Sequence, residues 1–344
     1  MDCPIRYKGV RHFGGGRLFA AIATLLLFAS CRQDSLVQLY GLAQGTYYSV
    51  QYRDTQHRNL QPQVDSLLAA FDQEVSLWVD SSLLRRVNRN EATEVTPLFA
   101  DILDKSLRIH DYTDGAFDCR IGRLVQAWGF SFRQREELSP TTLDSLLVAA
   151  RGNVMLDGLT LIKEAATELD FNAIAQGYAS DLVGQMLESY GIHDYLVDIG
   201  GEVVAHGEKG QRTPWRVGIE RPADNDTSTP VVMTAITLSD ASVVTSGSYR
   251  KYYEEDGVRY SHTIDPTTGR PVRHSLLSVS VVESESWLAD AMATAYMVMG
   301  LDKARAFIAA HPDGPGTDKV FFIYDEGGQL KSYATPAFEK LIIQ

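Results

Sequence analysis

Residues 169–179 read Leu169-Asp170-Phe171-Asn172-Ala173-Ile174-Ala175-Gln176-Gly177-Tyr178-Ala179, a stretch that passes from a strand into the start of a helix. Apolar residues then recur at helical spacing as far as Tyr190, and Gly191 ends the expected helix over 174–190. Strand-like runs dominate downstream of this helix. We expect strands at 195–199, 215–219, 231–238, 242–245, 277–282 and 320–324, and helices at 286–299 and 302–311.

Upstream of the same stretch the pattern is mostly helical. We expect one strand over 46–52 and helices over 64–71, 97–112 and 142–150. Strands and helices do not alternate as they do in a doubly wound parallel sheet, and the chain has no internal repeat. The sequence therefore predicts an α+β fold in a single domain over residues 43–344, with mixed strands and flanking helices.

The first thirty residues have the features of a secretory leader. Four basic residues precede the apolar run 18–29, which is too short to span a bilayer comfortably. The run ends in Phe28-Ala29-Ser30-Cys31, and small residues before a cysteine resemble the lipobox of bacterial lipoproteins. We expect a signal peptide over 1–30, a lipidated Cys31 and a tether over 31–42. A short transmembrane anchor is the alternative, and either arrangement places the folded part outside the cytoplasm.

Charge and cysteine content narrow the classes of function. The chain has 344 residues, of which 22% are charged, and a formal net charge of −12. Removal of the leader takes away four basic residues and one acidic residue, so the remainder is more acidic still. An acidic chain argues against a nucleic-acid partner. If Cys31 carries lipid, Cys119 has no cysteine to pair with and no disulfide can form.

Asp290 and Thr294 lie four residues apart in the expected helix 286–299, so their oxygen atoms share one helix face. Their neighbours are small or apolar, which predicts a partly buried carboxylate that needs a cation or hydrogen-bond donors. Carboxylate and hydroxyl oxygens suit Mg²⁺, which also binds oxygens of substrate phosphates. In the structural alternative, Asp290 bonds local amides and Thr294 bonds back to a helix carbonyl.

Several other stretches have both a structural and a functional explanation. Asp170 stands near a helix start, where its charge complements the helix dipole or where small neighbours let a ligand approach the backbone. The run Gly115-Ala116-Phe117-Asp118 suits a backbone that passes close to a flat ring, with core packing as the competing explanation. The glycine-containing segments 198–202 and 262–270 have strong turn chemistry, and each fits a structural turn as well as a site.

Six of these stretches occur together in the order found in one protein family. They are Gly115-Ala116-Phe117-Asp118, Asp170…Gly177-Tyr178-Ala179, Val197-Asp198-Ile199-Gly200-Gly201-Glu202, Thr245-Ser246-Gly247, His262-Thr263-Ile264-Asp265-Pro266…Gly269 and Ala289-Asp290-Ala291…Thr294-Ala295. Over most of residues 43–300 the chain resembles the ApbE family of FAD:protein FMN transferases. The resemblance implies a single ApbE-like, T-fold-related α+β domain. The lipobox agrees with it, because family members are commonly exported lipoproteins.

The resemblance also implies roles for individual residues. Mg²⁺ is expected at the backbone carbonyl of Ala173 and the side chains of Asp290 and Thr294, and by chemistry Asp290 and His262 are the nearest candidates for a catalytic base. Relatives commonly carry tyrosine in place of Trp78 and often a charged residue in place of Gln176. The positions expected to hold FAD are Gln44, Trp78, Ala116, Phe117, Asp118, Asp170, Gln176, Thr263 and Ile264.

The expected activity is Mg²⁺-dependent transfer of FMN from FAD to a threonine or serine hydroxyl of an acceptor protein, with formation of a phosphoester and release of AMP. Acceptors are expected among subunits of flavin-dependent redox pumps or other exported flavoproteins. The enzyme itself is expected as a lipoprotein anchored to the inner membrane and facing the periplasm. Two alternatives stay open: a pyrophosphatase that releases FMN and AMP from FAD, and a flavin-binding lipoprotein without catalytic activity.

Overall fold

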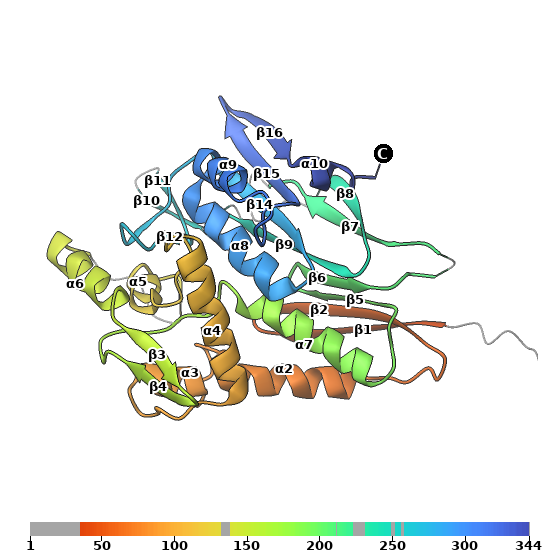
Figure 1. The fold of residues 1–344 in the computed structure, drawn as a ribbon, viewed down its shortest axis with the longest axis horizontal. Coiled ribbons are helices and arrows are strands. Elements are labelled where there is room, and N and C mark those ends of the chain that lie inside the picture. Colours follow the sequence, from red (N-terminus) through yellow and green to blue (C-terminus); the bar gives the residue numbers. More distant parts are fainter. Residues whose placement is uncertain are drawn as a thin grey trace, which may run out of the picture.

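The computed structural model describes residues 35–131, 138–210, 212–222, 231–248, 252–255 and 258–343. Within this part of the chain one antiparallel sheet of eight strands has the order β1-β2-β5-β6-β9-β14-β15-β16 (Figure 1). Its strands are β1 Ser35–Ala43, β2 Thr46–Asp54, β5 Tyr195–Ile199, β6 Glu202–His206, β9 Ala241–Gly247, β14 Leu276–Glu283, β15 Val320–Glu326 and β16 Gln329–Ala334.

Four two-stranded sheets accompany the large one. They are β3 Val154–Asp157 with β4 Thr160–Lys163, β7 Trp215–Glu220 with β8 Val232–Leu238, β10 Tyr252–Glu255 with β11 Val258–Ser261, and β12 Ile264–Asp265 with β13 Arg270–Pro271. The helices are α2 Gln61–Val75, α3 Leu83–Asn88, α4 Pro97–Tyr112, α5 Gly122–Ala127, α6 Pro140–Ala150, α7 Ala175–Ser189, α8 Ser286–Met299, α9 Leu301–Ala310 and α10 Pro336–Glu339.

The two faces of the large sheet are covered differently. Helices α2, α7 and α8 pack on one face and enclose the main hydrophobic core, and α4 runs past one end of them (Figure 1). The other face packs against the β7–β8 hairpin and α10, where Trp215 and Phe338 are fully buried in a second core. Helix α8 is buried on nearly all sides because it lies between the sheet strands β9 and β14 and helix α7. A polar side chain on α8 therefore lies in the interior.

The helices and strands expected from the sequence are present in the structure, which adds others such as β6, α3 and α5, and the fold class is confirmed. Helices α4 and α8 and strand β5 have the bounds expected from periodicity. The expected tether is wrong from residue 35 onwards, because residues 35–43 form β1 and pair with β2 along their whole length. Alternate side chains of β1, such as that of Leu39, point into the core, and their burial stabilises the strand. The expected signal peptide and Cys31 lie outside the described residues.

The cysteine that the structure describes is buried. Cys119 is a free, buried cysteine, and burial raises the pKa of its thiol far above the ordinary value. A buried thiol that resists ionisation is a poor nucleophile. Among the helices that the structure describes, none is both long enough and apolar enough to cross a membrane.

An ion pair at the end of β2 gives a prediction about stability. Asp54 is buried, and it accepts hydrogen bonds from Arg58 Nε at 2.8 Å and from the Arg58 backbone N–H at 2.9 Å. Arg58 also donates to the carbonyl of Tyr190, just beyond the end of α7. These hydrogen bonds from Arg58 are the main reason that the pKa of Asp54 falls to about 2.

We expect Arg58→Met to lower the free energy of unfolding by about 1–2 kcal/mol at neutral pH, because it leaves Asp54 buried without its partner. A lowered carboxyl pKa contributes stability above its ordinary value, and that contribution is lost as the pH falls towards the folded value. The difference between wild type and variant should therefore shrink below about pH 4. Urea denaturation at several pH values measures it. Arg89→Met is the control, since its partner Asp80 is exposed, and an equal loss there would contradict the prediction.

Candidate active site

Helices α7 and α8 cap each other. The residues before them, Ile174 and Glu285, provide no side-chain cap. Instead Asp290 Oδ2 of α8 accepts the backbone N–H of Gly177 in the first turn of α7 at 3.0 Å. Asp181 of α7 in turn accepts the N–H groups of Ser286 and Trp287, each at 2.9 Å. Each helix start, with its unpaired amides and positive dipole end, thus faces a carboxylate of the other helix.

The absence of a side chain at Gly177 permits this contact. A Cβ atom there would lie 2.4 Å from the carbonyl oxygen of Ser286 and 2.8 Å from Cβ of Asp290. Real Cβ atoms do not approach other atoms so closely, so any larger residue would push α8 away from α7. Gly177 therefore sets the position of Asp290 relative to the start of α7.

The electrostatic state of this contact is unusual. Asp290 is only 5% exposed, and burial raises the pKa of its carboxyl well above the usual range, with the nearby Asp181 adding to the effect. Burial likewise raises the pKa of Asp181. Two neighbouring carboxyl groups, one buried and one half-buried, disfavour double ionisation. A cation bound at Asp290 would reverse this preference and favour the ionised form.

Thr294 continues the same face of α8 towards the sheet. Its Oγ1 lies 3.3 Å from Oγ of Ser246 on β9, and the neighbouring Thr245 shares a hydrogen bond with Ser280 of β14. Thr294 is half-buried. The two candidate metal ligands thus lie on one helix, one against α7 and the other against the Thr245-Ser246-Gly247 segment.

Asp170 lies just before α7 and beside the 115–121 segment. Its backbone N–H donates to the carbonyl of Cys119 at 2.7 Å. Its Oδ1 accepts the N–H of Asn172 at 2.8 Å, whereas the buried Oδ2 has no hydrogen-bond partner. Burial raises the pKa of this carboxyl to about 6. A buried acceptor without a partner is costly, so Asp170 is suited to receive a donor from a ligand.

Gln176 and Gln44 approach the same region from two other elements. A Cβ on Gly200, which has a φ of +69°, would lie 2.8 Å from Nε2 of Gln176, so the 198–202 turn packs against the start of α7. Gln44 lies in the tight turn between β1 and β2 with a φ of +53°. Its buried Oε1 has no hydrogen-bond partner, although its side chain also bonds Asp72. Gln44 therefore has the same unused acceptor capacity as Asp170.

The side chains of the 115–118 segment already have partners within the protein. Asp118 forms a two-pronged ion pair with Arg120, with N–O distances of 2.9 Å, and Arg120 also contacts His110. Phe117 is buried in the main core, while Ala116 is half-buried at its edge. Packing and the ion pair thus fix the positions of Phe117 and Asp118, and Ala116 lies beside them at the edge of the core.

The remaining candidate site residues, Trp78 and 262–264, lie outside the contact of α7 and α8. Trp78, in the loop between α2 and α3, is 59% exposed and presents a large ring to solvent. His262 contacts the edge of Phe130, with ring centroids 6.4 Å apart. The Thr263 carbonyl accepts the N–H of Val272, and Ile264 is buried in a small core with α5 and α6. The structure groups Asp290, Thr294 and Gln176 around α7 and α8, and it assigns 262–264 to a neighbouring cluster.

Among the described residues, no three His, Cys, Asp or Glu side chains converge on one point. The metal ligands expected from the sequence are of another kind, since they comprise one carboxylate, one hydroxyl and the carbonyl of Ala173. The structure also reveals two residues that sequence reasoning missed, Asp181 and Ser246. An aspartate inside a helix is unfavourable, and this could have pointed to Asp181, whereas nothing in the sequence pairs Ser246 with Thr294.

Comparisons with known proteins agree with this arrangement. The sequence profile of the ApbE family matches residues 44–316. The FAD:protein FMN transferase of Vibrio cholerae is 34% identical over 94% of this chain and 98% of its own, and that of Escherichia coli K12 is 33% identical over 94% and 97%. In structure, the flavinyl transferase ApbE of Pseudomonas stutzeri in its apo form superposes with a TM-score of 0.79 at 32% identity, over 90% of this chain and 97% of that one.

A single α+β domain of this kind, with these relatives, defines a transferase enzyme. The chain belongs to the ApbE family.

Proposed function

We propose that the protein transfers FMN from FAD to a threonine or serine hydroxyl of an acceptor protein in a Mg²⁺-dependent reaction. The bond between the two phosphates of FAD breaks, the acceptor oxygen forms a phosphoester with FMN, and AMP leaves. The observation that carries this proposal is the buried Asp290, fixed by Gly177 at the contact of α7 and α8. Relatives named FAD:protein FMN transferase, which match nearly the whole chain, support the choice of substrate.

The residues at this contact fit a magnesium ion. A cation beside the buried Asp290 carboxyl would favour its ionised form, and the nearby oxygens are of the hard type that Mg²⁺ selects. Asp290, Thr294 and the Ala173 carbonyl would hold the ion. When bound, it neutralises charge on the phosphate oxygens and helps AMP to depart.

The protein residues around the ion bind and orient the flavin nucleotide. Asp170 and Gln44 supply buried acceptor oxygens, Gln176 supplies an amide, and Ala116 leaves room for a flat ring. The exposed Trp78 ring is available to stack on flavin or adenine. Of the two candidate bases, His262 suits the acceptor proton better, because Asp290 is engaged by Gly177 and by the proposed ion.

Incubation with FAD and Mg²⁺, with and without an exported flavoprotein acceptor, tests the activity. We expect AMP release together with a covalently fluorescent acceptor band on a denaturing gel. Equal amounts of free FMN and AMP, independent of acceptor, would indicate a pyrophosphatase. FAD that stays intact while bound would indicate a carrier without activity.

We also propose that the protein is an exported lipoprotein, anchored through Cys31 to the inner membrane and facing the periplasm. The motif Phe28-Ala29-Ser30-Cys31 supports this, and β1 begins at Ser35, four residues after Cys31. Four residues span at most about 14 Å, so the lipid would keep the β1 end of the sheet close to the membrane surface. Acceptors are then proteins exposed to the same compartment, such as subunits of flavin-dependent redox pumps.

We expect Cys31→Ala to give an unprocessed precursor without acyl groups, because the cysteine sulfur is the proposed lipid attachment point. Mass spectrometry of the purified protein and fractionation of cells measure both properties. Cys119→Ala is the matched control and should be processed normally. A wild-type protein with an intact N-terminus and no acyl group would contradict the anchor.

A further inference from the structure

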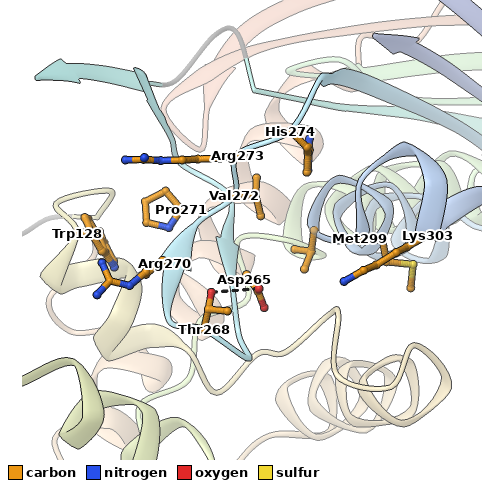
Figure 2. A pocket seen from close by; sticks show the side chains of 11 residues that line it. Trp128, Asp265, Thr268, Arg270, Pro271, Val272, Arg273, His274, Met299 and Lys303 are labelled. Atoms are coloured by element: carbon orange, nitrogen blue, oxygen red, sulfur yellow. Dashed lines mark hydrogen bonds between the residues drawn. The ribbon is translucent and has the colours of Figure 1, made fainter. Parts of the chain in front are cut away.

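A pocket with a volume of about 520 Å³ lies beyond the proposed metal ligands along α8. It opens between the β12–β13 hairpin and the junction of α8 and α9 (Figure 2). Its lining includes Trp128, Asp265, Arg270, His274, Val298 and Lys303. Figure 2 shows Lys303 reaching from α9 towards the hairpin, with Arg270 beside Trp128 on the hairpin itself.

The pocket is positively charged although the chain has a net charge of −12. Within the described part of the chain, neither Arg270 nor Lys303 forms an ion pair. The carboxylate in the lining, Asp265, accepts the N–H of Thr267 at 2.8 Å and the hydroxyl of Thr268 at 3.1 Å, so it is committed to its own turn. Two cations without acidic partners in one pocket fit a ligand with negative charge.

The position of the pocket relates it to the proposed reaction. Val298 follows Asp290 by eight residues in α8, which corresponds to about 12 Å along the helix axis. The hairpin on its other side begins at Ile264, two residues after His262, and Trp128 Nε1 fixes it by donating to the carbonyl of Gly269 at 2.7 Å. The pocket therefore lies next to the site at a fixed distance from Asp290.

We propose that this pocket binds acidic side chains of the acceptor polypeptide, on one side of the hydroxyl that receives FMN. The inference rests on the proposed function, which brings that hydroxyl to a phosphate held near Asp290 and Thr294. An extended peptide advances about 3.3 Å per residue, so a side chain about four residues from the acceptor hydroxyl reaches the pocket. The pocket thus selects acceptors by charge at a defined spacing.

Two fluorescently labelled peptides test this directly. Both are unstructured with one central threonine, and one carries aspartates four residues to either side where the other carries asparagines. We expect the full-length wild-type protein with FAD and Mg²⁺ to bind the aspartate peptide about tenfold more tightly in fluorescence anisotropy, and the difference to shrink in high salt. The double variant Arg270→Glu/Lys303→Glu should lose the preference. Arg305→Glu should keep it, because Arg305 lies over Tyr333 outside this pocket.

Each other outcome is decisive. Equal binding of the two peptides by wild type, including equally weak binding, overturns the proposal, as does a preference that survives in the double variant. Calorimetric titration should show unchanged FAD affinity in the double variant; a matching loss would assign the cations to the nucleotide and also overturn it. If wild type prefers the aspartate peptide yet never cleaves FAD, the proposed function fails while the peptide site stands.

Discussion

Replacement of Asp290 by asparagine should lower FAD cleavage and FMN transfer by about two to three orders of magnitude. The amide is nearly isosteric and keeps an oxygen that can accept the N–H of Gly177, so the contact of α7 and α8 should persist. What is lost is the negative charge that would bind Mg²⁺. Transfer measured by acceptor fluorescence, and cleavage measured by AMP release, report the loss.

The response to metal distinguishes this role from a structural one. Wild-type activity should vanish with EDTA and return with Mg²⁺, and Mg²⁺ should raise the unfolding temperature of wild type by mass action. Asp290→Asn should show no such rise, although its metal-free form should be at least as stable, since a buried charge near Asp181 is removed. Asp302→Asn, on the exposed side of α9, is the control. Undiminished activity in Asp290→Asn would leave Asp290 as a helix cap only.

The regular elements were predictable because their signals are local. Helix α4 begins after Thr96, whose hydroxyl caps it, and α8 ends before Gly300, which has a φ of +75°. Strand β1 was missed because its alternation is short and follows directly on the leader, and its partner β2 decides its conformation. Tertiary context determines such weakly patterned segments more than propensity does.

The candidate site at the contact of α7 and α8 was also predictable only in part, because a local sequence pattern does not encode contacts between distant residues. The spacing of Asp290 and Thr294 lies within one helix, so the sequence contains it. The capping of α8 by Asp181 joins residues 105 positions apart, which no local pattern encodes. At Asp118 the structure adds a partner that the sequence motif does not specify, since Arg120, only two residues away, forms an ion pair with the carboxylate.

The contact of α7 and α8 also makes a glycine essential. We expect Gly177→Ala to lower kcat/KM for transfer by about a hundredfold, because the added methyl group must push α8 outwards and displacements near 1 Å at a reacting centre have effects of this size. Overpacking should also reduce the free energy of unfolding by about 1–3 kcal/mol. Steady-state kinetics and urea denaturation measure the two effects separately.

Gly184→Ala provides the matched control on the same helix. Its added Cβ would lie 2.8 Å from the hydroxyl oxygen of Tyr195, the outer end of a side chain on β5, and its position is seven residues along α7 from Gly177. We expect a comparable change in stability from Gly184→Ala but nearly normal transfer. Equal losses of activity in both variants would reduce Gly177 to a general packing role. A large loss of transfer activity in Gly177→Ala alone would mean that the reaction depends on the separation of α7 and α8, because this separation sets the position of the Asp290 carboxylate.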